Sequence, residues 1–150
     1  MHGRAQDRRF DAFRLAASRG VFSGRVDPSA LPRLDDRVAG PGGYVDWTIH
    51  GCTDADGRPA ISVALDGEVP LTCQRCLGTV SERVEQSTLL LLARDEADLV
   101  RLDEASEREV VLAGEPLDPA ALVEDELLLT LPFAPRHEGD CAAPEGGAER

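Results

Sequence analysis

Four side chains in two distant parts of the sequence have the types and spacing of metal ligands. Cys73 and Cys76 form a C-x2-C turn followed by Leu77-Gly78, and His137 and Cys141 stand four residues apart in a Pro- and Gly-rich segment. Two thiolates at the first spacing converge on one tetrahedral ion such as zinc, and the glycine lets the backbone turn tightly. The interval between the pairs is longer than in common zinc fingers, so the fold must bring them together. Both a four-ligand site and a chain without metal fit this spacing.

The same residue types allow two other chemistries. A C-x2-C pair can be a redox centre, but that use places it at a helix N-terminus, whereas strand-like sequence lies on both sides here. His50 and Cys52, two apart on an expected strand, point the same way and could act as base and nucleophile. No oxyanion loop or third orienting group accompanies them, and no phosphate loop, dinucleotide fingerprint or HExxH motif is present. We therefore expect a binding protein and not an enzyme.

The formal charge of −12 is unevenly distributed along the chain. Residues 1–37 contain eight Arg and five acids, a net charge of +3, whereas residues 38–150 contain eight Arg and 23 acids, a net charge of −15. An acidic body repels phosphates and attracts basic partners, so direct contact with a nucleic acid would use the Arg-rich N-terminal segment. A solubilising surface explains the same charges without any partner.

Length and composition indicate one soluble domain over residues 1–150, with the Arg-rich segment 1–37 at its start and a loose tail at 142–150. A chain of this size typically buries roughly 68 to 70% of its unfolded surface, so it needs no metal merely to fold. No apolar signal region and no run near the roughly 18 apolar residues of a membrane span is present. We expect a cytoplasmic protein without membrane contact, whose thiols stay reduced.

The N-terminal third contains short helical signals. Phe10, Phe13 and Ala17 share one face at helical spacing, which predicts a short helix over residues 7–18. Asp27-Pro28 then gives an N-cap followed by a first-turn proline, and we expect about one helical turn there.

The middle of the chain has the alternating pattern of strands. Residues 45–49 and 61–65 alternate apolar and polar side chains around a turn, which predicts an antiparallel hairpin. A third run, Glu68 to Thr72, leads into Cys73, and the run Val80 to Leu92 leaves the C-x2-C turn. The two thiols should therefore lie at the tip of a strand-turn-strand element.

The following segment is acidic and harder to assign. Residues 94–109 fit either a mobile excursion or a solvated helix, and Val110 to Leu112 could add one short strand.

The strongest helix signal covers residues 119–131, with Asp118 as N-cap, Pro119 at the first position and Pro132 beyond the end. On a helical wheel, four apolar residues share one broad arc: Leu122, Val123, Leu127 and Leu129. Glu126 lies inside this arc, and Glu124 and Asp125 lie outside it. A carboxylate on an apolar face needs a partner, and an Arg of the same chain is the commoner one, with a basic group of a binding partner as the alternative.

Runs of strands followed by a helix predict an α+β fold. We expect an antiparallel sheet of four to six strands, partly curled or barrel-like, with a C-terminal helix and a short N-terminal helix.

Three blocks of the sequence stand in an order shared with a known family: TCQRCL at 72–77, LVEDELLL at 122–129 and LPFAPRH at 131–137. Together with a weaker similarity at residues 10–14, they make the chain resemble the YceD family, the bacterial large ribosomal RNA subunit accumulation proteins. The resemblance implies a cytoplasmic role in the synthesis, processing or stability of large-subunit (23S) ribosomal RNA, without known catalysis. Related branches have Cys at the position of His137 and a Cys matching Cys141, which is consistent with a structural Zn2+ because Cys and His exchange as zinc ligands.

Two hypotheses combine the charges with this resemblance. In the first, the chain is an adaptor in ribosome biogenesis: its acidic body, including Glu124, Asp125 and Glu126, holds a basic ribosomal protein or assembly factor, and the N-terminal segment with Arg14 contacts ribosomal RNA. In the second, the chain is a zinc- or redox-responsive regulatory binding protein.

Overall fold

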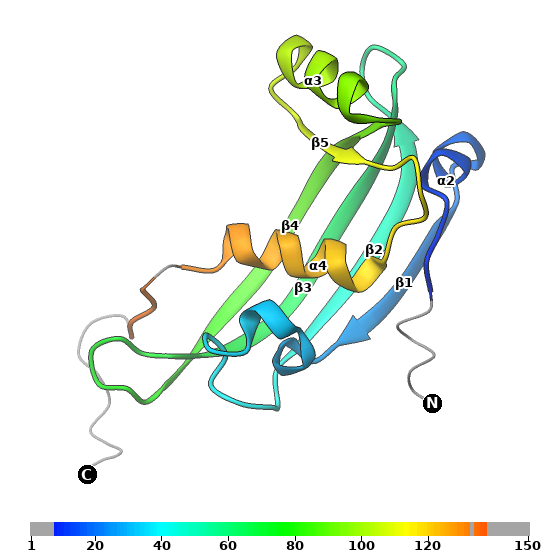
Figure 1. Ribbon diagram of the computed structural model, residues 1–150. Helices are drawn as coiled ribbons and strands as arrows, with labels where there is room; N and C mark the ends of the chain where they lie inside the picture. The colour runs from blue at the N-terminus through cyan, green and yellow to red at the C-terminus, as the bar shows by residue number, and fades with distance from the viewer. Residues whose placement is uncertain (1–7, 133, 138–150) are drawn as a thin grey trace.

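The computed structural model describes residues 8–132 and 134–137, and these form a five-stranded sheet in the order β1-β2-β3-β4-β5 (Figure 1). The strands are β1 (Val21–Val26), β2 (Tyr44–Thr53), β3 (Pro59–Thr72), β4 (Thr79–Ala93) and β5 (Glu109–Leu112). The run Glu68 to Thr72 continues β3 instead of forming a strand of its own. The expected α+β fold is confirmed.

The sheet differs from the expectation in two ways: it is mixed, and it is not closed into a barrel. The first three pairings are antiparallel, but β4 and β5 pair in parallel. The parallel pairing results from the crossover through α3 (Glu96–Ala105). This helix carries the chain back beside β4 before β5 begins, so β5 runs in the same direction as β4.

One face of the sheet carries the core. Along β3, Ile61, Val63 and Leu65 are buried, and Val63 pairs with Ile49 while Leu65 pairs with Trp47. The helix α4 (Pro119–Thr130) crosses this face, together with the single-turn helices η1 (Pro28–Ala30) and η2 (Pro32–Leu34) (Figure 1). The alternation read from the sequence thus corresponds to a half-buried sheet.

The N-terminal helix α2 (Ala12–Ser18) is shorter than predicted. It begins after Asp11, whose carboxylate accepts a hydrogen bond from the Arg14 backbone N–H. Phe10 lies outside the helix and forms an isolated antiparallel bridge with Leu117. Ala12 and Ala16 are the fully buried residues of α2. Of the predicted face, Phe10 and Phe13 pack against the core, but Ala17 is exposed.

The acidic segment forms the solvated helix of the two alternatives. The Asp95 carboxylate caps α3 by accepting from the Asp98 N–H, and none of the ten helical residues is buried. The turn after Asp27 is confirmed as η1, with the Asp27 carboxylate accepting from the Ser29 N–H. Within the part of the chain that the structure describes, no helix has the length and apolar character needed to cross a bilayer.

Candidate metal site and charged surfaces

The C-x2-C turn lies at the tip of the β3–β4 hairpin, as predicted. The Cys73 N–H donates to the Gly78 carbonyl over 2.8 Å, and the Leu77 N–H donates to the Cys73 carbonyl over 2.8 Å. Leu77 has a φ of 65°, a left-handed conformation that closes the turn at a non-glycine residue. This backbone directs both thiols toward one point.

The segment after α4 returns to this tip. The Gln74 N–H donates to the Pro135 carbonyl over 2.7 Å, and His137 Nδ1 lies 3.6 Å from Cys76 Sγ. His137 Nε2 lies 3.0 Å from the Thr79 carbonyl oxygen. In the tautomer that donates from Nε2 to this carbonyl, Nδ1 keeps its lone pair and faces the thiol.

The candidate ligand atoms of Cys73, Cys76 and His137 all lie within 4.8 Å of one another. Three of the four predicted ligands are therefore close enough to hold one ion, although 61 residues separate Cys76 from His137. Cys141, the fourth, lies outside the described residues. Two thiol sulfurs and an imidazole nitrogen are the donors that zinc prefers.

The electrostatics at the tip favour a thiolate. Burial raises the pKa of Cys73, but hydrogen bonds from the backbone N–H groups of Cys76, His137 and Arg75 and from the Cys76 thiol outweigh it and lower the pKa to about 5. Because the deprotonated sulfur is the metal ligand and also the reactive form, this shift suits both metal binding and thiol chemistry.

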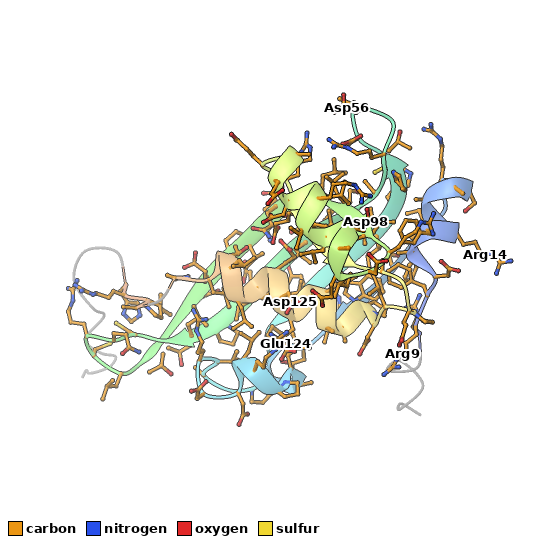
Figure 2. All side chains as sticks on the ribbon, turned by 45° about the horizontal axis from the view of Figure 1, so that its top comes forward. Arg9, Arg14, Asp56, Asp98, Glu124 and Asp125 are labelled. Atoms are coloured by element: carbon orange, nitrogen blue, oxygen red, sulfur yellow. The ribbon has the colours of Figure 1, made fainter. Side chains whose placement is uncertain are left out.

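Two of the three acids predicted to bind a partner are buried. Glu124 is only 6% exposed, and its carboxylate accepts from the Arg33 backbone N–H over 2.6 Å and from Arg33 Nε over 3.1 Å. Figure 2 shows Glu124 and Asp125 on α4, and the exposed Asp125 pairs with the same guanidinium. The wheel placed Glu124 outside the buried face, which is wrong because Arg33 on η2 supplies a partner that the wheel does not contain.

Glu126 is only 4% exposed. Gln86 Nε2 donates to Glu126 Oε1 over 3.4 Å, so this carboxylate is met by an amide where an Arg was expected. Burial raises the pKa of Glu126, a hydrogen bond from Thr88 opposes the rise, and the carboxylates of Glu109 and Asp125 add to it. Neither Glu124 nor Glu126 is available at the surface for a basic partner.

The apolar arc of α4 also needs one correction. Leu122, Val123 and Leu127 are buried as predicted, but Leu129 is 69% exposed. The buried face is centred nearer Val123, because η2 covers the side of α4 that carries Glu124. The helical wheel predicted the helix correctly. It could not include η2, whose contact with α4 adds the side of Glu124 to the buried face.

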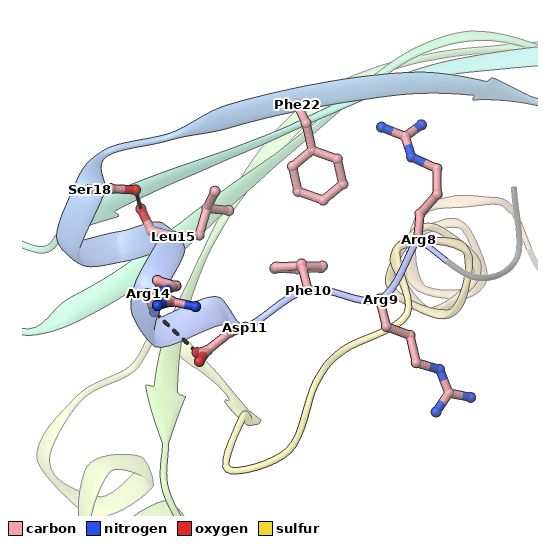
Figure 3. Close-up of a pocket in the computed structure, with 8 residues that line it drawn as sticks. All are labelled: Arg8, Arg9, Phe10, Asp11, Arg14, Leu15, Ser18 and Phe22. Atoms are coloured by element: carbon pink, nitrogen blue, oxygen red, sulfur yellow. Dashed lines mark hydrogen bonds between the residues drawn. The ribbon is translucent and has the colours of Figure 1, made fainter.

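Arg14 lies on α2 and points outward, as does Arg9 before the helix (Figure 2). Both line an open pocket of about 480 Å³ between α2 and β1, together with Arg8, Phe10 and Phe22 (Figure 3). Arg14 and the N-terminal segment were predicted from the sequence, but the pocket was not. The mixture of Arg and Phe at residues 8–14 was a signal for such a pocket, but β1, which contributes Phe22, was not predicted.

His50 and Cys52 lie on β2, with His50 exposed and Cys52 half-buried. Burial raises the pKa of the Cys52 thiol, which the charge of Arg19 partly opposes. A raised pKa leaves less thiolate at neutral pH, the opposite of what nucleophilic catalysis requires.

A protein-family model described as large ribosomal RNA subunit accumulation protein YceD matches residues 61–150. No solved structure matches the chain. The matched region runs from β3 to the C-terminal segment and contains Cys73, Cys76 and His137, so the residues that converge at the hairpin tip all lie within it. Because the match extends over more than half of the chain, the protein belongs to the YceD family of large ribosomal RNA subunit accumulation proteins.

Proposed function

We propose that this protein is a non-catalytic adaptor that supports the synthesis, processing or stability of large-subunit ribosomal RNA during ribosome biogenesis in the cytoplasm. Its membership in the YceD family carries the proposal, because the family description names large-subunit ribosomal RNA. The charge distribution supports an adaptor with two contacts: the N-terminal segment contacts RNA, and the acidic body contacts a basic ribosomal protein or assembly factor.

The acidic contact is assigned to the region around α3. Residues 95–109 contain seven acids and two Arg, a net charge of −5, and Asp103, Glu104 and Glu107 are exposed there. This region replaces Glu124 and Glu126, whose carboxylates are buried. An exposed acidic surface attracts basic proteins and raises their rate of association.

In this proposal a structural Zn2+ holds the hairpin tip against the segment after α4. Cys73, Cys76 and His137 would be three of its ligands, and Cys141 is the fourth that the sequence predicts. The ion would fix the C-terminal segment in place and would take no part in catalysis. Two hydrogen-bonded contacts across the same junction support this role, from Gln74 to Pro135 and from His137 to Thr79.

A second function is favoured by the lowered pKa of Cys73. A thiolate beside a second thiol oxidises readily, so the tip could act as a zinc- or redox-responsive regulatory element that releases its ion and alters partner binding. Unchanged partner binding after thiol oxidation and metal removal would exclude this alternative.

The adaptor proposal is tested in a strain that lacks the gene. We expect the ratio of large-subunit to small-subunit ribosomal RNA to fall and to be restored by the wild-type chain. Crosslinking in growing cells should recover large-subunit RNA together with ribosomal proteins or assembly factors. An unchanged RNA ratio, or crosslinks to neither class of molecule, contradicts the proposal.

The same strain separates the metal from the adaptor. We expect a variant with Cys73→Ser and Cys76→Ser to restore the RNA ratio poorly, and a Cys52→Ser variant to restore it fully, because Cys52 lies away from the tip on β2. Full restoration by the double variant would keep the ribosomal role and remove the metal from it.

A further inference from the structure

We propose that the open pocket between α2 and β1 binds one nucleotide of single-stranded RNA, with the base against Phe10 and Phe22 and the phosphates on Arg9 and Arg14. This inference rests on the proposed function and names the RNA-binding site of the N-terminal segment. The pocket combines the two features that such a ligand requires, a partly apolar aromatic floor and cations around it.

The floor of the pocket is a small cluster of aromatic rings in edge-to-face contact. The ring centroids of Phe10 and Phe22 are 5.0 Å apart with an interplanar angle of 68°, and those of Phe22 and Trp47 are 5.5 Å apart with an angle of 86°. Trp47 is buried beneath the floor, whereas Phe10 and Phe22 are only half-buried. Two ring surfaces held in place by a buried neighbour give a base a preformed apolar contact.

Arg8 lies over two rings of this cluster and is held there by a hydrogen bond. Its guanidinium lies 5.3 Å from the Phe22 ring centroid and 5.2 Å from that of Trp47, and Nη1 donates to the Ser23 carbonyl over 3.1 Å. Its position adds positive charge at the rim of the pocket without requiring the side chain to become ordered on binding.

Arg9 and Arg14 at the rim differ from five Arg residues elsewhere in the chain that are held in ion pairs. Several other Arg side chains pair with acids of the chain: Arg25, Arg33, Arg58, Arg83 and Arg101. Arg9 and Arg14 are exposed, and neither forms an ion pair with any described residue. Asp11 is the acid at the pocket, and its carboxylate is engaged by the Arg14 N–H as the cap of α2. Three cations and one anion leave the pocket positive in an otherwise acidic protein.

The shape of the pocket favours a single strand. Figure 3 shows Arg8 and Arg9 on one side of the pocket and Arg14 on the other, with Phe10 and Phe22 between them. A strand that places one base on the rings would therefore have cations near the phosphates on both sides of that nucleotide. The volume of about 480 Å³ falls within the range of small-molecule sites. A duplex hides its base faces, and the acidic body would repel its second strand.

The test measures binding of a labelled 12-nucleotide single-stranded RNA by the full-length protein, using fluorescence anisotropy at several salt concentrations. We expect Arg9→Gln with Arg14→Gln to weaken binding at least about tenfold and to lower the slope of log affinity against log salt by roughly 1.4, since each single-strand phosphate contact contributes about 0.7. The matched control, Arg108→Gln with Arg136→Gln, removes two exposed charges elsewhere and should change affinity little.

Two further readouts report on the base. Phe10→Leu keeps apolar volume but removes the flat ring, and we expect about a tenfold loss of affinity if the variant retains the wild-type unfolding transition. Trp47 is the one Trp in the sequence and lies under Arg8, so RNA binding should change its fluorescence in the wild-type protein.

Three results overturn the inference: equal losses in the two double variants, equal binding of the corresponding RNA duplex, or displacement of the RNA by inorganic phosphate or an oligoglutamate peptide at the same charge concentration. Each leaves the proposed role in large-subunit ribosomal RNA standing, with the RNA contacted by other residues or through a partner. Conversely, pocket-dependent RNA binding in a protein whose deletion leaves ribosomal RNA unchanged would support the site and contradict the proposed function.

Discussion

At the scale of single residues, the clearest effect of the fold is on the pKa of the Cys73 thiol. Backbone N–H groups around the turn lower its pKa to about 5, so the tip offers a thiolate at neutral pH before any ion arrives. The spacing of the cysteines predicted the turn, because two thiols with two residues between them can converge only if the chain reverses. The sequence could not show that His137 comes within 3.6 Å of Cys76, since that depends on where α4 ends and how the following segment returns.

We predict that the protein binds one Co2+ in place of Zn2+ and gives the absorption of a tetrahedral thiolate site. Cys76→Ser should reduce the sulfur-to-cobalt charge-transfer band and weaken binding by at least about tenfold, because a thiolate ligand is lost. Cys52→Ser is the control and should leave the spectrum unchanged, because Cys52 lies on β2 and outside the ligand group. An identical spectrum in both variants would place the ion elsewhere.

Glu126 gives a prediction with a defined pH dependence. Burial, with a smaller contribution from the carboxylates of Glu109 and Asp125, raises its folded-state pKa above the ordinary 4.5, so the folded protein binds this proton more tightly than the unfolded chain does. The stabilisation from this proton is fully present below pH 4.5 and is lost as the pH rises through the higher folded-state pKa. Glu126→Gln imitates the protonated side chain, so this variant should keep the stabilisation as the pH rises.

We therefore expect Glu126→Gln to be more stable than wild type at pH 7 by about 1 kcal/mol, with the difference disappearing toward pH 4. Urea unfolding followed by Trp47 fluorescence at several pH values measures this. The exposed Glu104→Gln on α3 serves as the control and should change stability by less than about 0.5 kcal/mol at every pH. A destabilised Glu126→Gln variant at pH 7 would mean that the ionised carboxylate is the form the fold requires.

At the scale of elements, the sequence predicted what depends on local pattern and missed what depends on packing. The β2–β3 hairpin, the η1 turn and α4 follow from alternation, an N-cap and a first-turn proline. The strand β1 has a weak signal because Gly24 interrupts it. Gly24 is required there because a Cβ would lie 2.6 Å from the Trp47 ring, which is a constraint from the neighbouring strand.

The contact of α2 with β2 has the same origin in close backbone packing. A Cβ at Gly51 would lie 2.0 Å from the Leu15 carbonyl oxygen and 2.7 Å from the Ala16 nitrogen, both in the backbone of α2. Gly51→Ala should therefore displace the helix and lower the free energy of unfolding by about 1 to 3 kcal/mol. Since α2 carries Arg14 and Leu15, RNA binding at the pocket should weaken as well.

Gly78→Ala is the matched control for this substitution. It adds the same methyl group at the hairpin tip, where the nearest atom is Cys76 Sγ at 3.4 Å, an ordinary contact distance. Urea unfolding of both variants and RNA anisotropy at one salt concentration provide the comparison. Equal effects of the two methyl groups would show that the contact between α2 and β2 tolerates expansion.

At the scale of the whole molecule, the two charged regions lie on different elements. The cationic pocket lies between α2 and β1, whereas the acidic region is α3 and the residues after it, which lead to β5. The two regions meet at one point, because Phe13 of α2 lines a second pocket together with Asp98 and Leu102 of α3. RNA and a basic protein would therefore contact different side chains on neighbouring elements.

Neutralising α3 should separate the two activities. The triple variant Asp103→Asn, Glu104→Gln, Glu107→Gln should lose most of its cosedimentation with large-subunit precursor particles, because the attraction to basic proteins falls. Its affinity for single-stranded RNA should stay the same or rise slightly, because three charges that repel phosphates are gone. The control triple variant Asp35→Asn, Asp36→Asn, Glu68→Gln makes the same change in net charge with exposed acids that lie outside residues 95–109. If both triple variants lose cosedimentation equally, the particles respond to overall charge and α3 is not a docking surface; if only the α3 variant does, the acidic contact of the adaptor is local.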